Sequence, residues 1–189
     1  MRKPSGISVT RSFASGLALL AVAVQIPAGV SAQSSQVAAT PVHATLNQVM
    51  RGVQFPLSNV VFSSQGNDPA AVKQDARPSA ATDLLASVFG GWQAVENSSL
   101  GLAESATLLT IPGRKCANGV AVPVQNADWI RFVQGLRDAG EAAYRAAQSK
   151  NQDKMLEVSE QVAASCSNCH QVYRKAGTQA DALVNRCKP

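Results

Sequence analysis

The sequence predicts an all-α protein, an antiparallel four-helix bundle, and three observations lead to this fold class. Apolar residues recur at helical spacing in four separate segments of the chain. One long and two short connections join these segments, which is the pattern of bundles with antiparallel neighbours. Apart from a few residues around 119–124, no segment alternates apolar and polar residues over the length of a strand.

Composition limits the class of protein further. Of the 189 residues, 46% are apolar and 15% are charged. This apolar content is enough to close a hydrophobic core and excludes a disordered chain or a disulfide-dense miniprotein. The sparse charge argues against a nucleic-acid-binding protein with a broad basic face.

Residues 1–32 have the pattern of a secretory signal peptide. A basic start is followed by an apolar run over 13–24 and by the small residues that end at Ala32. An uncleaved membrane anchor is the alternative, but the run is shorter than the roughly 20 residues that span a bilayer. We expect cleavage after Ala32 and one periplasmic domain over 33–189, without stable membrane insertion.

Removing this segment also removes most of the net charge. It contains three of the 17 basic residues and none of the 12 acidic ones, so the formal charge falls from +5 to 14 − 12 = +2. A nearly neutral exported domain shows no sign of electrostatic steering towards a partner.

The first predicted helix follows Thr40 and Pro41, which fit an N-cap and a proline at the first helical position. We expect Pro56 to kink or end this helix, although the apolar face could extend beyond it. The residues at helical spacing are Leu46, Val49, Met50 and Val53.

The second predicted helix starts at Ser79, after a loop over 64–78. Gly90 and Gly91 weaken it in the middle. A long connection follows over about 98–126, with a short helix near 102–109. The expected apolar face contains Leu85, Val88, Phe89, Trp92 and Val95.

The third and fourth helices have clear starts. Asn126 and Asp128 introduce the third helix, and Asn151 begins a fourth that runs through Tyr173 and is stopped by Gly177. The apolar face of the third helix consists of Trp129, Phe132, Val133, Leu136, Ala143 and Tyr144.

The fourth helix carries the motif Cys166-Ser-Asn-Cys169-His170, which is typical of c-type haem attachment. Cysteines three residues apart on a helix point the same way, so both thiols can form thioethers to one porphyrin. His170 lies four residues after Cys166 on that face, where its imidazole can bind the iron. We therefore expect one covalently attached haem c per chain.

Two other interpretations of Cys166 and Cys169 are weaker. A thioredoxin-like redox pair needs a βαβ context, which is absent from this sequence. A zinc site needs four ligands, and the other candidates are Cys116, Cys187 and His43.

A sixth iron ligand has to come from upstream, because no methionine follows Met155. Met155 precedes His170 on the same helix by about 22 Å at 1.5 Å per residue, so it cannot cross to the other side of the haem. Met50 and His43 remain, and Met50 shares the apolar face of the first helix whereas His43 lies nearer the surface. We expect Met50 to be the sixth ligand; the alternative is a methionine that only fills the core.

The helical pattern, together with Tyr173-Arg174 after the Cys166–His170 motif, resembles the class II cytochromes c, the cytochrome c′ and cytochrome c-556 group. The resemblance covers about residues 41–176. Met50 matches the first-helix position at the distal face, where family members carry methionine, leucine or another residue. Arg174 matches a basic residue beside the proximal histidine, and the resemblance implies that it can reach a propionate. The alternative for Arg174 is a solvated arginine at a helix end.

The chain departs from short family members in its longer connection between helices two and three and in its tail. Each insert carries one cysteine, Cys116 and Cys187. In an oxidising compartment two such cysteines favour a disulfide within the chain. Two free thiols or an intermolecular bridge are the alternatives.

These observations predict an electron-transfer protein with an unidentified redox partner protein. We expect no enzymatic activity, because no further His, Cys and acid constellation suits acid–base or nucleophilic chemistry. One alternative is a five-coordinate haem that binds NO or CO, if Met50 only lines the pocket. Another is a redox subunit of a larger dehydrogenase. The resemblance also implies a homodimer formed through the first two helices. Trp129, Phe132 and Tyr173 are candidates for the dry wall of the haem pocket.

Overall fold

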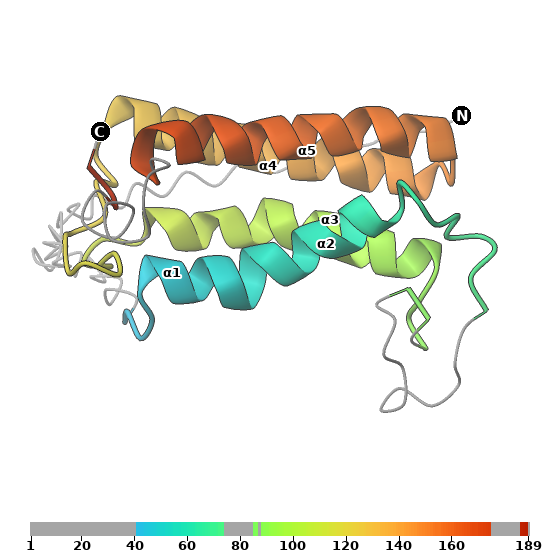
Figure 1. Ribbon diagram of the computed structural model, residues 1–189, viewed down its shortest axis with the longest axis horizontal. Coiled ribbons are helices and arrows are strands. Elements are labelled where there is room, and N and C mark those ends of the chain that lie inside the picture. Colours follow the sequence, from blue (N-terminus) through green and yellow to red (C-terminus); the bar gives the residue numbers. More distant parts are fainter. Residues whose placement is uncertain (1–40, 74–84, 87, 175–185, 189) are drawn as a thin grey trace, which may run out of the picture. The chain divides into compact units, whose positions relative to one another are not determined.

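The computed structural model describes residues 41–73, 85–86, 88–174 and 186–188. The chain divides into residues 1–38 and 39–189, and every described residue belongs to the second unit. The predicted signal peptide, Ser79 and Gly177 lie outside the described residues. The described part forms four helical rods that pack against one another (Figure 1). It contains no strand, and an isolated antiparallel bridge joins Lys115 and Ala121.

The first rod begins later than the sequence predicts. It consists of α1 (Leu46–Val49), the π-helical turn η1 (Met50–Gln54) and α2 (Phe55–Ser63). Thr45 Oγ1 accepts a hydrogen bond from the Gln48 N–H at 3.3 Å, and the Gln48 side chain accepts one from the Thr45 N–H at 2.8 Å. This reciprocal capping box fixes the start of the helix. The predicted placement of Pro41 at the first helical position is therefore wrong.

Pro56 does not end the first helix. The π-helical turn comes directly before it, and the Phe55 N–H donates to the carbonyl of Met50. Proline has no N–H and its ring crowds the carbonyl four residues earlier, so a wider turn at this point lets the helix continue.

The second rod consists of α3 (Trp92–Ser105) and the 3₁₀ helix η3 (Ala106–Thr110). Gly91, at φ 61°, is its N-cap. Leu85 and Phe89 therefore precede the helix, and the expected helix over them is wrong. The region 98–110, predicted to be mostly a connection, is helical, so the connection covers only 111–126.

The third and fourth predicted helices are confirmed as α4 (Ala127–Gln148) and α5 (Gln152–Tyr173). Asn126 is the N-cap of α4. Asn151 caps α5, where its Oδ1 accepts a hydrogen bond from the Lys154 N–H at 3.0 Å. Both helices begin after an asparagine and keep an uninterrupted helical periodicity. For this reason their positions could be predicted from the sequence.

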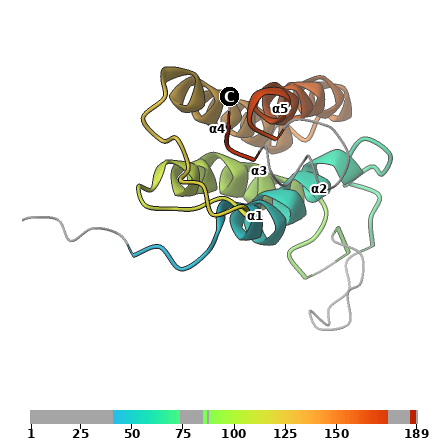
Figure 2. The ribbon, with the colours of Figure 1, turned by 60° about the vertical axis from the view of Figure 1, so that its left-hand side comes forward.

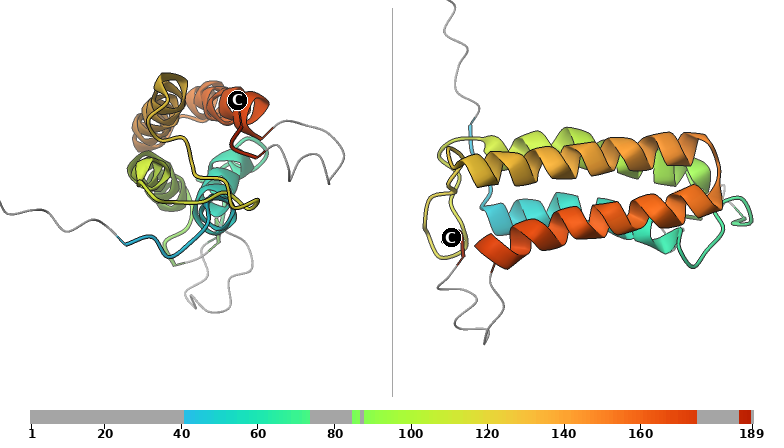
Figure 3. Two further views of the ribbon diagram at one scale, coloured as in Figure 1. Left: turned by 90° about the vertical axis from the view of Figure 1, so that its left-hand side faces the viewer. Right: turned by 90° about the horizontal axis from the view of Figure 1, so that it is seen from above.

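Seen end-on, the four rods lie side by side around a common centre (Figures 2 and 3). α3 packs against α2 and α4, α4 also packs against α5, and α5 touches α2. The approach of α3 to α4 is tight, since a Cβ atom on Gly140 would lie 2.7 Å from the Ala103 nitrogen. None of the described helices is long and apolar enough to cross a bilayer.

The core forms two clusters. One joins α2, α3, α4 and the first half of α5, and it contains the fully buried Met155. The other joins α1, η3, the start of α4 and the end of α5. Its buried members are Val49, Ala106, Leu109, Cys116, Val122, Trp129, Val133, Leu136, Tyr173 and Cys187.

The connection over 111–126 is bonded to η3, to the chain before α1 and to the C-terminal tail. Arg114 is only 4% exposed, and its guanidinium donates to the carbonyls of Leu108 and Ala44 at 3.1 and 2.6 Å. Cys116 is linked to Cys187 with their Cα atoms 6.4 Å apart, as the predicted disulfide within the chain requires. The connection therefore holds the chain before α1 and the C-terminal tail together.

Candidate functional site

A cavity of about 700 Å³ is lined mainly by residues of the second cluster, with Phe62 and Leu102 from the first. Its volume falls in the range of ligand and cofactor sites in proteins. The first rod, the start of α4, the end of α5 and the disulfide line it. The apolar and aromatic lining residues are Leu46, Met50, Phe55, Phe62, Leu102, Leu109, Trp129, Phe132, Val133, Leu136 and Tyr173.

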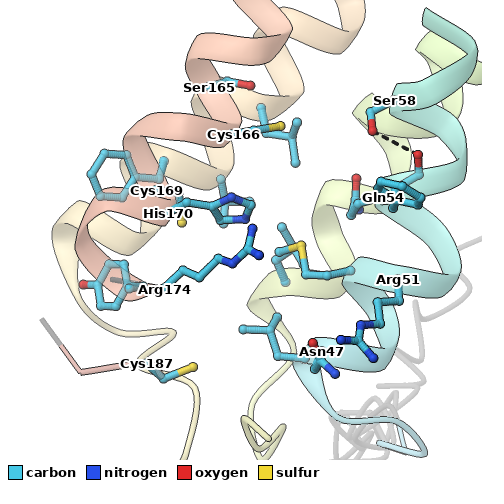
Figure 4. Close-up of a pocket in the computed structure, with 18 of the residues that line it drawn as sticks. Asn47, Arg51, Gln54, Ser58, Ser165, Cys166, Cys169, His170, Arg174 and Cys187 are labelled. Atoms are coloured by element: carbon cyan, nitrogen blue, oxygen red, sulfur yellow. Dashed lines mark hydrogen bonds between the residues drawn. The ribbon is translucent and has the colours of Figure 1, made fainter. Parts of the chain in front are cut away.

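On one side of the cavity, α5 contributes Cys166, Cys169 and His170. All three are half-buried, and both cysteines are free thiols. Their spacing of three and four residues puts them on one face of the helix. Figure 4 shows the Cys166 sulfur and the His170 imidazole pointing from α5 into the space in front of the first rod.

The π-helical turn of the first rod borders the same cavity with Met50, Arg51 and Gln54. Of the two upstream candidates for an iron ligand, only Met50 borders the cavity, whereas His43 is exposed before the start of α1. Met155 lies in the other core cluster, as its position along α5 requires. The structure therefore brings Met50 to the cavity that His170 borders.

Gln54 has a buried oxygen without a partner. Its Nε2 donates to Ser105 Oγ at 3.0 Å, and Ser105 Oγ donates in turn to the carbonyl of Gly101. This chain of donors fixes the orientation of the amide. Gln54 Oε1 is left buried with no hydrogen-bond partner in the described part of the chain. Among the described residues, Ser99 Oγ and Gln152 Oε1 are also buried without a partner, and neither residue lines the cavity. The Gln54 oxygen thus adds one unpaired acceptor to the cavity wall.

Aromatic side chains form the wall between α4 and the end of α5. Trp129 is 1% exposed, donates from Nε1 to the carbonyl of Leu109 at 3.0 Å, and meets Tyr173 edge-on at 4.9 Å between ring centroids. Phe132 meets the other side of Tyr173 at 6.3 Å. The three residues predicted as a dry wall thus lie together at the cavity.

Burial shifts the pKa values of the α5 side chains. It raises the pKa of the Cys166 thiol, and burial with the charges of Cys166 and Asp128 raises the pKa of Cys169 to about 11. Both thiols are protonated at neutral pH, whereas a reactive redox cysteine needs a lowered pKa. Burial, followed by Arg174 and Arg186, lowers the pKa of His170, which keeps its imidazole in the neutral form that binds metals.

The other candidate ligands for a zinc site are not free to bind a metal at the cavity. Cys116 and Cys187 are used in the disulfide, and His43 is exposed and does not line the cavity. Within the described ranges, no group of three or more His, Cys, Asp or Glu residues is placed to hold a metal ion.

No protein-family model, curated protein or solved structure matches this chain.

Arg174, Arg51 and Arg186 also border the cavity. Sequence reasoning found Arg174 and the structure places it at the cavity; Figure 4 shows its side chain reaching towards His170. The sequence did not indicate Arg51, which directly follows Met50, or Gln54, whose place at the site depends on its hydrogen bond to Ser105. It also missed Arg186, for which the sequence gives no signal because the disulfide determines its place.

The Asp128 carboxylate stabilises the aromatic wall in a pH-dependent way. It accepts hydrogen bonds from the Tyr173 hydroxyl at 2.6 Å and the Trp129 N–H at 2.8 Å. The Tyr173 bond is the main cause of its lowered pKa. A lowered pKa in the folded state means that the stabilisation is present above the unfolded-state pKa and is lost as the pH falls through the folded-state value.

We therefore expect Asp128→Asn to be less stable than wild type at neutral pH, with the difference shrinking as the pH falls below about 4. Urea unfolding between pH 7 and pH 3 measures this. Asp138→Asn is the matched control, because Asp138 is exposed on α4 and bonds only Gln134. A difference between wild type and Asp128→Asn that does not change with pH would contradict the role of this carboxylate.

Proposed function

We propose that this chain is an exported monohaem c-type cytochrome of class II, an antiparallel four-helix bundle that transfers single electrons in the periplasm. It would exchange them with a redox partner protein and would not be an enzyme itself. One observation carries the proposal. Cys166, Cys169 and His170 from one helix and Met50 from another rod border the same apolar cavity.

The donor set fits a c-type haem. The two thiols that thioethers require are free, while the other two cysteines of the chain are paired. His170 would be the proximal ligand and Met50 the sixth, an imidazole and thioether pair that is usual for electron-transfer haems. When bound, the haem supplies a one-electron couple at its iron.

The remaining residues exclude water and fix the site. Trp129, Phe132 and Tyr173 pack edge to face along the cavity, and the Tyr173 hydroxyl is held by Asp128. A dry pocket with fixed side chains limits reorganisation around the cofactor and influences its reduction potential. The buried Gln54 oxygen, one helical turn from Met50, adds a polar group to the first-rod side.

Ligation by Met50 is tested by the visible spectrum of the protein matured with haem, recorded oxidised, reduced, and reduced under CO. We expect wild type to be low-spin and to resist CO, because the thioether occupies the sixth position. Met50→Ala should be high-spin and bind CO. Met155→Leu is the control, since Met155 is buried in the other core cluster and the exchange conserves volume.

A wild-type protein that is already high-spin and binds CO as readily as Met50→Ala would contradict ligation by Met50. That result would favour the five-coordinate alternative, a haem that binds NO or CO, over electron transfer.

A further inference from the structure

Three arginines from three separate parts of the chain converge on the cavity. Arg51 comes from the π-helical turn, Arg174 directly follows α5, and Arg186 belongs to the C-terminal tail. Arg51 and Arg174 are exposed and Arg186 is half-buried, whereas Trp129 and Tyr173 of the cavity wall are buried. The three arginines therefore bring positive charge to the lining of a largely apolar cavity, and Figure 4 shows the Arg174 side chain reaching towards His170.

Within the part of the chain that the structure describes, the cavity lining offers these positive charges no counter-charge. No acidic residue is among the described residues that line the cavity, and none of the three arginines forms an ion pair in the described ranges. Burial, and after it the charges of Arg174 and Arg51, lowers the pKa of Arg186. Like charges that repel one another in this way would be stabilised by a bound anion.

Arg186 is held in place from both sides. The Cys116–Cys187 disulfide anchors the next residue to the connection over 111–126. Asn118 Nδ2 donates to the Arg186 carbonyl at 2.9 Å, and the Cys187 N–H donates to the carbonyl of Tyr173 at 2.9 Å. The tail is thus fixed to the end of α5, next to Arg174.

We propose that Arg51, Arg174 and Arg186 form a carboxylate-binding site at the edge of the cavity, and that the disulfide positions Arg186 in it. This inference rests on the proposed function, because its occupant is the pair of carboxylates that a haem carries on one edge. A flat apolar ligand with two carboxylates matches a cavity that has a largely apolar lining and three arginines. Guanidinium groups bind carboxylates through paired charge-assisted hydrogen bonds.

The test uses the mature chain with Cys166→Ala and Cys169→Ala, so that porphyrins bind reversibly. The probes are haemin and haemin dimethyl ester, which lacks free carboxylates, and binding is followed by quenching of tryptophan fluorescence, since Trp129 lines the cavity. We expect haemin to bind more tightly than the ester. Arg186→Gln should weaken haemin binding about tenfold and leave ester binding unchanged.

Arg145→Gln is the matched control, because Arg145 is exposed on α4, pairs with Glu141 and does not line the cavity. It should bind haemin as the parent chain does. Cys116→Ser with Cys187→Ser should lose as much haemin affinity as Arg186→Gln, and adding Arg186→Gln to it should cause no further loss. If the serine variant does not fold, as judged by circular dichroism, the reduced parent chain replaces it.

Four results would overturn the inference or part of it. Equal binding of haemin and its ester, or an Arg186→Gln chain that behaves like Arg145→Gln, would remove the carboxylate site and leave the proposed function intact. Full haemin affinity after loss of the disulfide would remove the positioning role of Cys116 and Cys187. Failure of the parent chain to bind either porphyrin would overturn this inference, whereas the proposed function is decided by covalent haem in the wild-type chain, which keeps both thiols.

Discussion

A chain with Cys166→Ala and Cys169→Ala is expected to contain no covalently bound haem after export with the c-type maturation enzymes. Both thioethers require these thiols, which lie on one face of α5 at the cavity. Haem staining of a denaturing gel, on which only covalently attached haem stays with the chain, measures the loss.

The matched control replaces the other two cysteines. Cys116→Ser with Cys187→Ser removes the same number of sulfur atoms but leaves the attachment motif intact, so this chain should keep covalent haem. Loss of staining in the control as well would mean that folding, and not the thiols of α5, limits attachment. Staining that persists in the Cys166→Ala and Cys169→Ala chain would contradict the assignment of the motif.

Removing the disulfide is expected to lower the free energy of unfolding by about 4 kcal/mol, on the chain-entropy model for a loop of this length. The bridge joins residues 71 apart in the sequence, and it ties the tail to the connection before α4. Without it the unfolded chain gains conformational freedom while the packing of the helices stays unchanged. For a domain of this size, we expect the melting temperature to fall by about 10 °C.

Urea unfolding of wild type and of Cys116→Ser with Cys187→Ser measures this difference. A reductant provides the internal control, because it should destabilise wild type to the level of the double variant and leave the double variant unchanged. Equal stability of the two chains under oxidising conditions would show that the cysteines are not paired in the folded protein.

The sequence was most informative where local signals agree with one another. α4 and α5 each begin after an asparagine and continue with unbroken helical periodicity, so their limits could be predicted. The start of the first helix was wrong because the capping box at Thr45 and Gln48 outweighs the proline at 41. The predicted helix in this region started too early and ended too early compared with α3. The glycine pair before Trp92 was expected in the middle of a helix, and the serines inside α3 are typical of loops.

In the candidate site, too, residues given by local spacing could be predicted, whereas residues placed by tertiary contacts could not. Cys166, Cys169 and His170 are neighbours on one helix, so their spacing alone brings them together. Met50 could be predicted as the sixth ligand because the other methionines were eliminated. Gln54 depends on the hydrogen bond to Ser105, and Arg186 depends on the disulfide, so both need tertiary structure to be recognised.

The central claim, a covalently attached haem c, is tested most directly by the intact mass of the wild-type chain exported with c-type maturation enzymes, measured after extraction with acidified acetone. We predict the mass of the mature chain plus one haem, with the reduced pyridine spectrum of a porphyrin whose two vinyl groups are saturated. A chain that loses its haem in the extraction, or that never acquires one, would contradict the assignment of Cys166, Cys169 and His170 as a haem-attachment site.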